Sequence, residues 1–403
     1  MMTSKTITVL EKYLGLILCA WFTFYKKLAN LFVSEIDQTT KKIVFVKFIE
    51  QGALILHQAA FKEAAAKYGS ENIFLCTFSS NQQLADVIQL VPDGNRIYIN
   101  DTSMADFALS YIMAISKIRK TGIDTVIDLE FFSRASAVFC YLTGAARRVG
   151  YHRFKGLQNY RGDLFTHRVN YSHYVHVAES SWSLLKSLDV PVQNLPALDI
   201  ALHQSVTEPS FTPLAGDLVR LDSLLGVNAN EKMFLLVINL SLNDLLPLRK
   251  WPKEHFGRLI VALKEEFPSA VFVFTGRADE FNLTQQFIDT LVLKGAINLC
   301  GKTQIRDILT LYSKSKLLIT SDSGPAHFAS LTTVHTLVMF GPETPALYAP
   351  LSARTHVFYQ GLPCSPCYNV YNNRLSSCTN NICMQRITVE SVLDKARQLL
   401  VEL

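Results

Sequence analysis

The sequence has little excess charge of either sign. Its 403 residues include 39 lysines and arginines against 34 aspartates and glutamates, which leaves a formal net charge of +5. A basic surplus of this size is compatible with an anionic ligand or a membrane surface, but it is too small to indicate a nucleic-acid-binding protein. Apolar residues make up 49% of the chain, so the composition excludes a disordered or fibrous protein. The length predicts two or three domains, each able to bury a core.

Cysteine is too scarce for a secreted scaffold held by disulfides, because only eight occur in the chain. Four stand alone in apolar runs, a pattern that predicts buried thiols. They are Cys19, Cys76, Cys140 and Cys300. The other four cluster near the C-terminus, at Cys364, Cys367, Cys378 and Cys383. Their spacing fits a structural zinc site, two disulfides or reduced thiols in a loop, and these alternatives stay open.

Long hydrophobic runs are also missing. The apolar segment Tyr13–Tyr25 has 13 residues and is followed at once by Lys26 and Lys27. A helix of that length covers about 20 Å, less than the ~30 Å hydrocarbon core of a bilayer. No small-residue cleavage site of a signal peptide is evident before the globular part. The segment therefore predicts either a helix lying in the membrane interface or a helix packed on the protein's own surface, and its aromatic residues beside lysines favour the membrane.

Short β-rich runs alternate with helical segments from Lys41 onward, which predicts an α/β fold with parallel sheets covered by helices. The expected strands of the first half are 42–48, 72–78, 96–99 and 125–129, with helices at 53–68 and 102–119. Those of the second half are 233–239, 270–275, 297–300, 316–320, 336–340 and 356–359, with helices at 253–266, 280–294, 305–313 and 325–332.

A proline- and glycine-containing stretch at 204–216 predicts a linker between the two halves. We therefore expect an apolar N-terminal segment (1–40), two α/β domains (41–205 and 217–386) and a closing helix (387–403). Parallel α/β sheets bind ligands beyond the carboxyl ends of their strands. The residues that follow each expected strand are consequently the candidates for a functional site.

The strongest local pattern is Ser321-Asp322-Ser323-Gly324-Pro325-Ala326-His327, which directly follows an expected strand. A polar, glycine-containing turn before a helix presents unpaired backbone N–H groups, and such a helix start binds anions. Asp322 is placed to accept hydrogen bonds from sugar hydroxyls, and His327 can reach back to the same anion. The alternative is a helix cap by Asp322 or Ser323 beside a packed histidine.

Further polar residues follow neighbouring strands of the same expected sheet, and their convergence on one crevice is more informative than any one of them. They include cations suited to a diphosphate, a threonine that can donate to a phosphate, and acids suited to ribose hydroxyls. The set is Arg249, Lys250, Thr275, Gly276, Asp279, Glu280, Lys302, Gly341 and Thr344. Each member has an ordinary alternative as a turn residue or a solvated charge.

In the first half, Glu50 follows the first expected strand, and Asp128 and Glu130 end the fourth. A carboxylate at such a sheet edge can take a proton from a hydroxyl, and Glu50 is the best placed of the three. Its alternative is a charge at a helix terminus. A basic tract in the same half either holds phosphates or is a solvated face. It comprises Arg134, Arg147, Arg148, His152, Arg153 and Lys155.

Together these motifs resemble glycosyltransferase family nine, the ADP-heptose:lipopolysaccharide heptosyltransferases. The resemblance runs from about Lys42 to the C-terminus, and its most specific parts are S-D-S-G-P-A-H, F-G-P-E-T-P, R-K-W-P and C-S-P-C. It implies the GT-B fold, in which two Rossmann-like domains have parallel sheets that face each other across a cleft. It also implies an inverting reaction that needs no metal ion, with the nucleotide-sugar donor on 217–386 and the acceptor on 41–205.

The resemblance gives individual residues a role. Asp322 would contact the donor sugar, and Arg249 would stand at the family's phosphate-binding cation. Ser323, Gly324 and His327 would contact the diphosphate. The family also has similar C-terminal cysteines without a known catalytic metal.

One position departs from the family pattern. Family members often have Gly-Asp-Val at the start of the first helix, where the aspartate is the proposed base, whereas this chain has Gly52-Ala53-Leu54. Ala53 cannot accept a proton, so either Glu50 replaces that base or catalysis is lost. The departure also weakens the assignment of heptose as the sugar.

The leading hypothesis is a glycosyltransferase that moves a sugar from a nucleotide-sugar donor to a lipid-linked glycan such as a lipopolysaccharide core. We expect it to lie peripherally on the cytoplasmic face of the inner membrane, with Glu50 and Asp322 as catalytic residues. No cofactor for catalysis and no nucleic-acid partner are expected, and a structural zinc is the one metal considered. The alternatives are a nucleotide-sugar epimerase or hydrolase of the same fold, and an inactive protein that binds a glycan or a nucleotide sugar.

Overall fold

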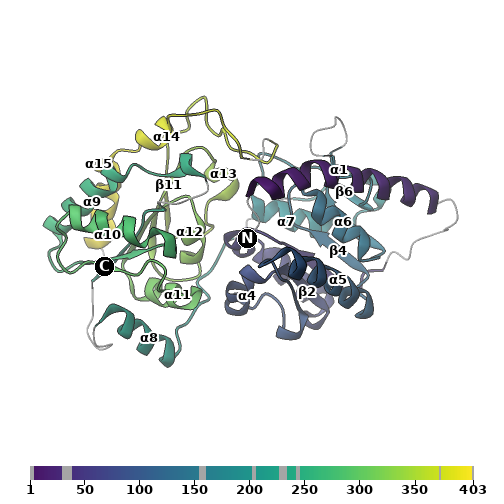
Figure 1. Cartoon of the computed structure of the whole chain (residues 1–403), viewed down its shortest axis with the longest axis horizontal. Coiled ribbons are helices and arrows are strands. Elements are labelled where there is room, and N and C mark those ends of the chain that lie inside the picture. The colour runs from purple at the N-terminus through teal and green to yellow at the C-terminus, as the bar shows by residue number, and fades with distance from the viewer. Residues whose placement is uncertain are drawn as a thin grey trace. The chain divides into compact units, whose positions relative to one another are not determined.

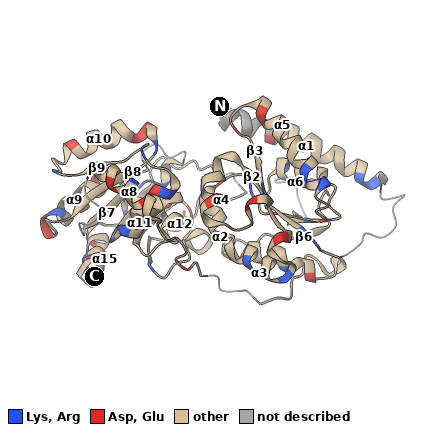
Figure 2. Ribbon diagram, turned by 90° about the horizontal axis from the view of Figure 1, so that it is seen from below, with Lys and Arg blue, Asp and Glu red and all other residues tan. Residues whose placement is uncertain are grey.

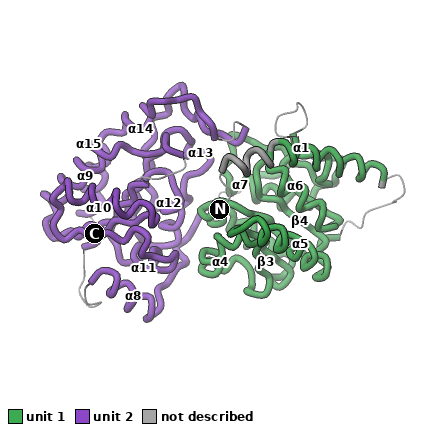
Figure 3. The backbone as a smooth tube through the Cα atoms, viewed as in Figure 1, with its two compact units in different colours: residues 1–205 green, residues 206–403 purple. Residues whose placement is uncertain are grey.

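The structure is a computed structural model that describes residues 4–29, 39–153, 160–201, 206–226, 234–241, 246–371 and 374–401. The chain divides into two compact units, coloured separately in Figure 3. Unit 1 comprises Met1–Ser205, and unit 2 comprises Val206–Leu403. Helix α8 begins at Ala215, inside the expected linker 204–216.

Unit 1 is built on one sheet whose strands consist largely of buried β-branched, aromatic and leucine residues, types that suit extended backbone. The strands are β1 (Ile43–Val46), β2 (Ile73–Phe78), β3 (Arg96–Ile99), β4 (Thr125–Asp128), β5 (Arg147–Tyr151) and β6 (His167–Val169). Every neighbouring pair is parallel, in the order β3-β2-β1-β4-β5-β6. The order reverses between β1 and β4, and such a switch point is where open parallel sheets bind ligands.

Helices cover the sheet of unit 1 (Figure 1). They are α1 (Ser4–Ala29), α2 (Gln51–Leu56), α3 (Gln58–Tyr68), α4 (Gln82–Ile88), α5 (Met104–Lys120), α6 (Arg134–Leu142) and α7 (Val177–Lys186). The apolar segment Tyr13–Tyr25 lies within α1, which packs against α6. No helix in the described part of the chain is both long and apolar enough to cross a bilayer.

Unit 2 repeats this plan. Its strands are β7 (Leu235–Asn239), β8 (Val271–Thr275), β9 (Ile297–Asn298), β10 (Leu317–Ser321), β11 (His335–Phe340) and β12 (Thr355–Tyr359). They are all parallel, in the order β12-β11-β10-β7-β8-β9. Counted from β7 as the first strand, this is the same order as in unit 1, and its switch point lies between β7 and β10.

The helices of unit 2 bury a core around Trp251, Phe256 and Phe272. They are α8 (Ala215–Leu225), α9 (Lys253–Glu266), α10 (Phe281–Thr290), α11 (Ile305–Lys314), α12 (Gly324–Ala329), α13 (Pro345–Tyr348), α14 (Ile382–Gln385) and α15 (Val389–Val401). The expected α/β class, with one parallel sheet in each half, is therefore confirmed.

The sequence did not predict two of the strands, β5 and β6, or the helices α4, α6, α7, α8, α13 and α14. The strand β5 begins with two arginines, which were interpreted as part of a basic tract rather than as residues of a buried strand. Arg148 is in fact buried, and its Nε donates to the Leu164 carbonyl at 2.8 Å. A single helix expected at 53–68 is also interrupted, since α2 ends at Leu56 and α3 begins at Gln58.

Candidate active site

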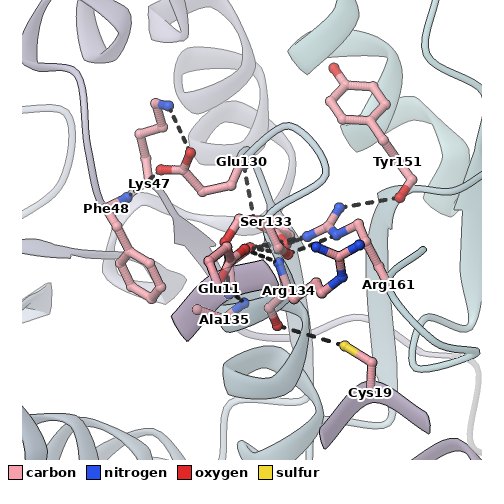
Figure 4. A network of polar contacts seen from close by, with 12 residues as sticks. Glu11, Cys19, Lys47, Phe48, Glu130, Ser133, Arg134, Ala135, Tyr151 and Arg161 are labelled. Atoms are coloured by element: carbon pink, nitrogen blue, oxygen red, sulfur yellow. Dashed lines mark hydrogen bonds and ion pairs between the residues drawn. The ribbon is translucent and has the colours of Figure 1, made fainter. Parts of the chain in front are cut away.

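A buried lysine organises the switch point of unit 1. Lys47 directly follows β1, and its side chain is fully buried. Its Nζ lies 3.2 Å from Glu130 Oε2, beyond the end of β4, and 3.3 Å from Glu50 Oε2. Figure 4 shows the contact between Lys47 and Glu130. A buried ammonium needs such partners, because an unpaired charge in the interior is costly. The lysine therefore ties together the ends of β1 and β4.

Glu130 acts on the backbone that follows β1. Its Oε1 accepts hydrogen bonds from the backbone N–H groups of Phe48 at 2.7 Å and Ile49 at 3.1 Å. Burial raises the pKa of Glu130, and the positive charge of Lys47 opposes that rise. A carboxylate that is buried and bound in this way positions the segment leading to Glu50. Glu130 was one candidate base, and its contacts make it a positioning residue instead.

Glu50 has a different environment from Glu130. It precedes α2 with φ 68° and ψ 82°. This is the left-handed region of the backbone, which residues other than glycine rarely adopt. Its side chain is 27% exposed, against 6% for Glu130. A strained residue is kept only where its surroundings hold it, and such residues concentrate at functional sites. Of the acidic side chains at the ends of β1 and β4, Glu50 is the one that solvent reaches.

Asp128 was the third candidate base, and the structure places it in the interior. Its side chain is fully buried and pairs with the fully buried Arg161. Asp128 also accepts hydrogen bonds from Ser136 Oγ at 2.8 Å and from the Glu130 N–H at 3.0 Å. Burial raises the pKa of Asp128, while the charge of Arg161 lowers it. Because both carboxylate oxygens are engaged and no solvent reaches them, Asp128 serves the fold.

Arg161 is a residue that the sequence did not single out. Its guanidinium donates to the Ser133 carbonyl at 2.8 Å, to Ser136 Oγ at 3.0 Å and to the Tyr151 carbonyl at 3.2 Å, in addition to its pair with Asp128 (Figure 4). No local pattern marks it, because its partners are up to 33 residues away in the chain.

The expected basic tract is not a single patch. Arg147 donates to Thr40 Oγ1 at 2.6 Å, and Arg134 donates to the Tyr160 carbonyl at 2.8 Å. Burial lowers the pKa of His152 to about 4, with Arg168 adding to the effect. These side chains, like Arg148, mostly serve the unit's internal structure, and Lys155 lies outside the described residues.

His57 was also not predicted as a functional residue. It stands between α2 and α3, is buried, and neither ring nitrogen has a hydrogen-bond partner among the described residues. Burial lowers the pKa of His57 from its ordinary value of 6.5 to about 3, and the charge of Lys47 adds to the effect. The ring is therefore neutral in the folded protein near neutral pH.

This burial predicts a sensitivity to acid. Between pH 6.5 and pH 3 the unfolded chain protonates His57 and the folded chain does not, so stability falls as pH falls, by at most about 1.4 kcal/mol per pH unit. Urea unfolding of His57→Phe should show a smaller loss across this window than the wild type. The exposed His173, changed to Phe, is the comparison: burial lowers the pKa of this ring too, so its effect should have the same direction as that of His57→Phe but be smaller. Parallel curves for wild type and His57→Phe would contradict the assignment.

The switch point of unit 2 holds a comparable pair. Asp322 directly follows β10 and is buried, and its backbone N–H donates to the Met339 carbonyl at 2.9 Å. Arg249, in the segment after β7, places Nη1 3.7 Å from Asp322 Oδ2. The Trp251 N–H donates to Ser321 Oγ at 3.1 Å, which joins this segment to the end of β10. The structure thus brings together Arg249 and Asp322, two residues predicted from the sequence.

The motif's helix, α12, is short. It has six residues, and no side chain caps its start. Ser323 Oγ instead donates to the Ser321 carbonyl at 2.9 Å, so the expected alternative of a helix cap by Ser323 does not hold. His327 lies in α12 and is buried. A Cβ on Gly324 would meet only ordinary van der Waals contacts, so packing alone does not require glycine there.

The residues after β11 have local structural roles. A Cβ on Gly341 would lie 2.5 Å from Met384 Sδ, so the packing of α14 requires this glycine. Thr344 caps α13 by accepting from the Ala346 N–H at 3.3 Å. Glu343 is buried and pairs with Arg374 at 2.9 Å, a contact that the sequence did not predict.

The expected residues after β8 and β9 also have local partners. Glu280 is buried and accepts from the Arg277 N–H at 2.7 Å, and Asp279 pairs with the Arg277 side chain at 3.0 Å. Lys302 lies over the Phe281 ring at 4.8 Å. Thr275 is buried, and a Cβ on Gly276 would come within 2.6 Å of Glu280. In this structure the expected binding residues after β8 and β9 therefore make contacts within unit 2 that stabilise its fold.

A cavity of about 530 Å³ opens beside the segment that carries Arg249. Its lining includes Lys250–Phe256 together with Leu240, Asn381 and Gln385. Asn381 Nδ2 donates to the Lys250 carbonyl at 2.8 Å and holds this segment against α14. Lys250 is the member of the expected binding set that lines this cavity.

The cysteine predictions have two outcomes. Cys19, Cys76, Cys140 and Cys300 are buried free thiols, as predicted. The four C-terminal cysteines form no disulfide in the described part of the chain, so the disulfide alternative is wrong for this structure. Within the described part of the chain, no group of three or more His, Cys, Asp or Glu side chains is arranged to hold a metal ion. The structure therefore gives the zinc alternative no support.

Comparison with known proteins connects this geometry to a family. The profile of glycosyltransferase family 9 (heptosyltransferase) matches residues 113–376, more than half of the chain. Lipooligosaccharide heptosyltransferase 2 of Campylobacter jejuni is 25% identical over 155 residues, 38% of this chain and 47% of that protein. Lipopolysaccharide heptosyltransferase 2 of Escherichia coli K12 is 28% identical over 112 residues, 28% of this chain and 32% of that protein. The alignments thus span about half or less of these curated relatives.

The fold extends further than the sequence match. The structure of E. coli ADP-heptose LPS heptosyltransferase II has a TM-score of 0.66 to this chain at 18% identity, covering 90% of this chain and 99% of that one. Arg249, Asp322 and His327 lie inside the segment that matches the family profile, whereas Glu50 lies before it. The chain belongs to glycosyltransferase family 9.

Proposed function

We propose that the protein transfers a heptose or a related sugar from a nucleotide-sugar donor to a lipid-linked glycan, with inversion at the anomeric carbon. The observation that carries the proposal is the charged pair Arg249 and Asp322 at the switch point of unit 2, inside the segment that matches the family. The heptosyltransferases among its relatives supply the sugar and acceptor classes.

In this proposal unit 2 binds the donor. Arg249 and Lys250 supply positive charge for the diphosphate, and Thr344 can donate a hydrogen bond to it. The family resemblance implies that Ser323, Gly324 and His327 also contact it. Asp322 accepts hydrogen bonds from the sugar hydroxyls. When the bond to the anomeric carbon breaks, negative charge develops on the diphosphate, and Arg249 and His327 stabilise it electrostatically. This requires Arg249 to exchange part of its contact with Asp322 for the donor.

Unit 1 supplies the base. Glu50 takes the proton of the acceptor hydroxyl, whose oxygen then attacks the anomeric carbon from the face opposite the diphosphate. The exposure of Glu50 and the contacts that hold it, through Lys47 and the Glu130-bound backbone, support this role. The carboxylate would thereby replace the acid that the family often has at the position of Ala53. Because the acceptor is lipid-linked, we place the reaction at the cytoplasmic face of a membrane.

Donor binding is testable without an acceptor. A nucleotide sugar that binds only the folded protein should raise its melting temperature. We expect one member of a nucleotide-sugar panel to do so, and Asp322→Ala to weaken its affinity by about 10- to 100-fold, the effect of losing hydrogen bonds to a charged group. Asp394→Ala, which removes an exposed carboxylate from α15, should bind the donor normally.

The outcomes separate the proposed function from its alternatives. A panel without any stabilising nucleotide sugar would overturn the proposal. Wild-type affinity in Asp322→Ala would remove Asp322 from the sugar site. Conversion of the bound donor in the absence of acceptor would indicate an epimerase or a hydrolase. Binding without turnover on any glycolipid extract would indicate the inactive binding protein.

A further inference from the structure

The N-terminal helix α1 is fixed to unit 1 along one face. Gly15 and Cys19 are buried on this face, and a Cβ on Gly15 would lie only 2.9 Å from Arg134 Cβ. Near its start, Glu11 accepts hydrogen bonds from the N–H groups of Arg134 and Ala135 at the beginning of α6 (Figure 4). Small residues thus allow a close approach between the two helices.

The other end of α1 is fixed as well. The Asp163 N–H donates to Thr23 Oγ1 at 2.8 Å, and Lys26 Nζ donates to the Asp163 carbonyl at 2.7 Å. Phe22 packs against Tyr141 with ring centroids 5.4 Å apart. Contacts at both ends set the rotation of the helix about its own axis, so the opposite face is held outward.

That outward face consists of large apolar side chains. Ile17 and Trp21 are each 64% exposed, and Phe24 is 62% exposed. The other large apolar residues on it are Tyr13, Leu14, Leu16, Tyr25 and Leu28. The segment Tyr13–Tyr25 contains no charged residue. A soluble helix normally turns its polar face to water. In α1, by contrast, the face that packs on α6 contains small residues, and most of the large apolar side chains lie on the face that is exposed.

Helix α5 carries a second exposed apolar face. Its outward residues Leu109, Ile112 and Met113 are exposed, as is Met104 at its start. The Tyr111 hydroxyl donates to the Ala135 carbonyl at 3.3 Å, and the N–H of the same Ala135 donates to Glu11 of α1. Both helices therefore contact Ala135 at the start of α6.

The charges around this surface identify its occupant. Exposed cations stand at the C-terminal ends of both helices, Lys27 on α1 and Lys117, Arg119 and Lys120 on α5. Figure 2 shows α1 tan along its middle and blue near its C-terminal end. Trp and Tyr rings at the boundary of an apolar stripe, with cations beside them, suit the interface of a bilayer that contains anionic lipid.

We propose that the outward faces of α1 and α5 form a docking surface for an anionic phospholipid bilayer, into which Ile17, Trp21 and Phe24 insert. The helix is bound to unit 1 and does not span, so it lies in the plane of the interface. The inference deepens the proposed function, on which it rests for the presence of a lipid-linked acceptor.

The test is flotation of the full chain with vesicles of phosphatidylcholine, with and without phosphatidylglycerol. We expect binding that increases with phosphatidylglycerol and decreases with salt. The triple variant Ile17→Gln/Trp21→Gln/Phe24→Gln should bind at least about tenfold more weakly, because three buried apolar contacts are lost. The matched control Val219→Gln/Leu283→Gln/Leu375→Gln changes exposed apolar residues of unit 2, which are 68%, 44% and 69% exposed, and should bind as the wild type does.

Tryptophan fluorescence gives a local signal. Of the three tryptophans, Trp182 and Trp251 are buried and Trp21 is exposed. Vesicles should shift the emission to shorter wavelength, and brominated lipid should quench it. Trp21→Phe should abolish both changes while it keeps most of the binding, since phenylalanine is also apolar.

Three outcomes would overturn the proposal. The first is equal vesicle binding by the wild type and the triple variant. The second is an emission change that persists in Trp21→Phe. The third is a wild type that ignores vesicles but forms a dimer by light scattering, which the triple variant abolishes; that result would assign the face to a second copy. Donor binding, measured without lipid, should be unchanged in the triple variant, so a failure here is distinguishable from a failure of the proposed function.

Discussion

Replacing Glu50 by glutamine is expected to lower kcat for sugar transfer by about 10²- to 10⁴-fold, the usual contribution of a general base. The amide keeps the shape of the side chain but cannot accept the proton of the acceptor hydroxyl. Donor affinity should stay unchanged, because we place the donor on unit 2. The measurement is initial rates at saturating donor, with the melting temperature recorded beside them.

The fold should tolerate this change. Lys47 keeps its contact with Glu130 in the variant, so its buried ammonium still has a carboxylate partner. Asp93→Asn is a suitable control, because it removes an exposed carboxylate that precedes β3, at the amino ends of the parallel strands, whereas Glu50 lies at their carboxyl ends. Wild-type kcat in a folded Glu50→Gln protein would show that another group takes the proton.

Replacing Arg161 by methionine is expected to destabilise unit 1 by about 3–5 kcal/mol, the cost of leaving one member of a buried ion pair without its partner. Asp128 would keep its place in the interior and lose its counterion. Three further hydrogen bonds from Arg161, to Ser133, Ser136 and Tyr151, would be lost with it. Urea unfolding followed by the fluorescence of Trp182 in unit 1 measures the change.

Two companion variants make this result specific. Arg168→Met removes an arginine that is 41% exposed and pairs with Asp163 at 3.0 Å, and a surface pair of this kind is worth at most about 1 kcal/mol. The double variant Asp128→Leu/Arg161→Met removes both buried charges and should recover much of the lost stability. If Arg161→Met unfolds at the same urea concentration as Arg168→Met, the buried pair does not stabilise the unit as we infer.

The features predicted best from the sequence are those that depend on neighbouring residues in the chain. Strands such as β3 and helices such as α9 were placed within a residue, because apolar runs and helix periodicity lie in consecutive residues. Arg249 and Asp322 lie close together, as expected for residues that follow strands of one parallel sheet, although their direct contact was not predicted.

What the sequence missed depends on distant partners. Arg148 reads as a surface charge until Leu164 provides a carbonyl for it, and Arg161 has no visible role until Asp128 is beside it. Gly341 was expected to admit a ligand, yet its space is taken by Met384. For the apolar N-terminal segment, the two interpretations drawn from the sequence are not exclusive. The packing of α1 on α6 is confirmed. The exposed apolar face of α1 supports the membrane interpretation, which stays a proposal.

The two units share one strand order, and each has a charged pair at the corresponding position. In each unit a cation after the first strand meets a carboxylate after the fourth, Lys47 with Glu130 and Arg249 with Asp322. In unit 1 the two charged groups are 3.2 Å apart, and the carboxylate of Glu130 also accepts hydrogen bonds from two backbone N–H groups. These contacts fix the position of the segment that follows β1. In unit 2 the contact is 3.7 Å. The same arrangement thus holds a shorter contact where it supports a neighbouring residue, and a longer one where we propose that the donor competes for the cation.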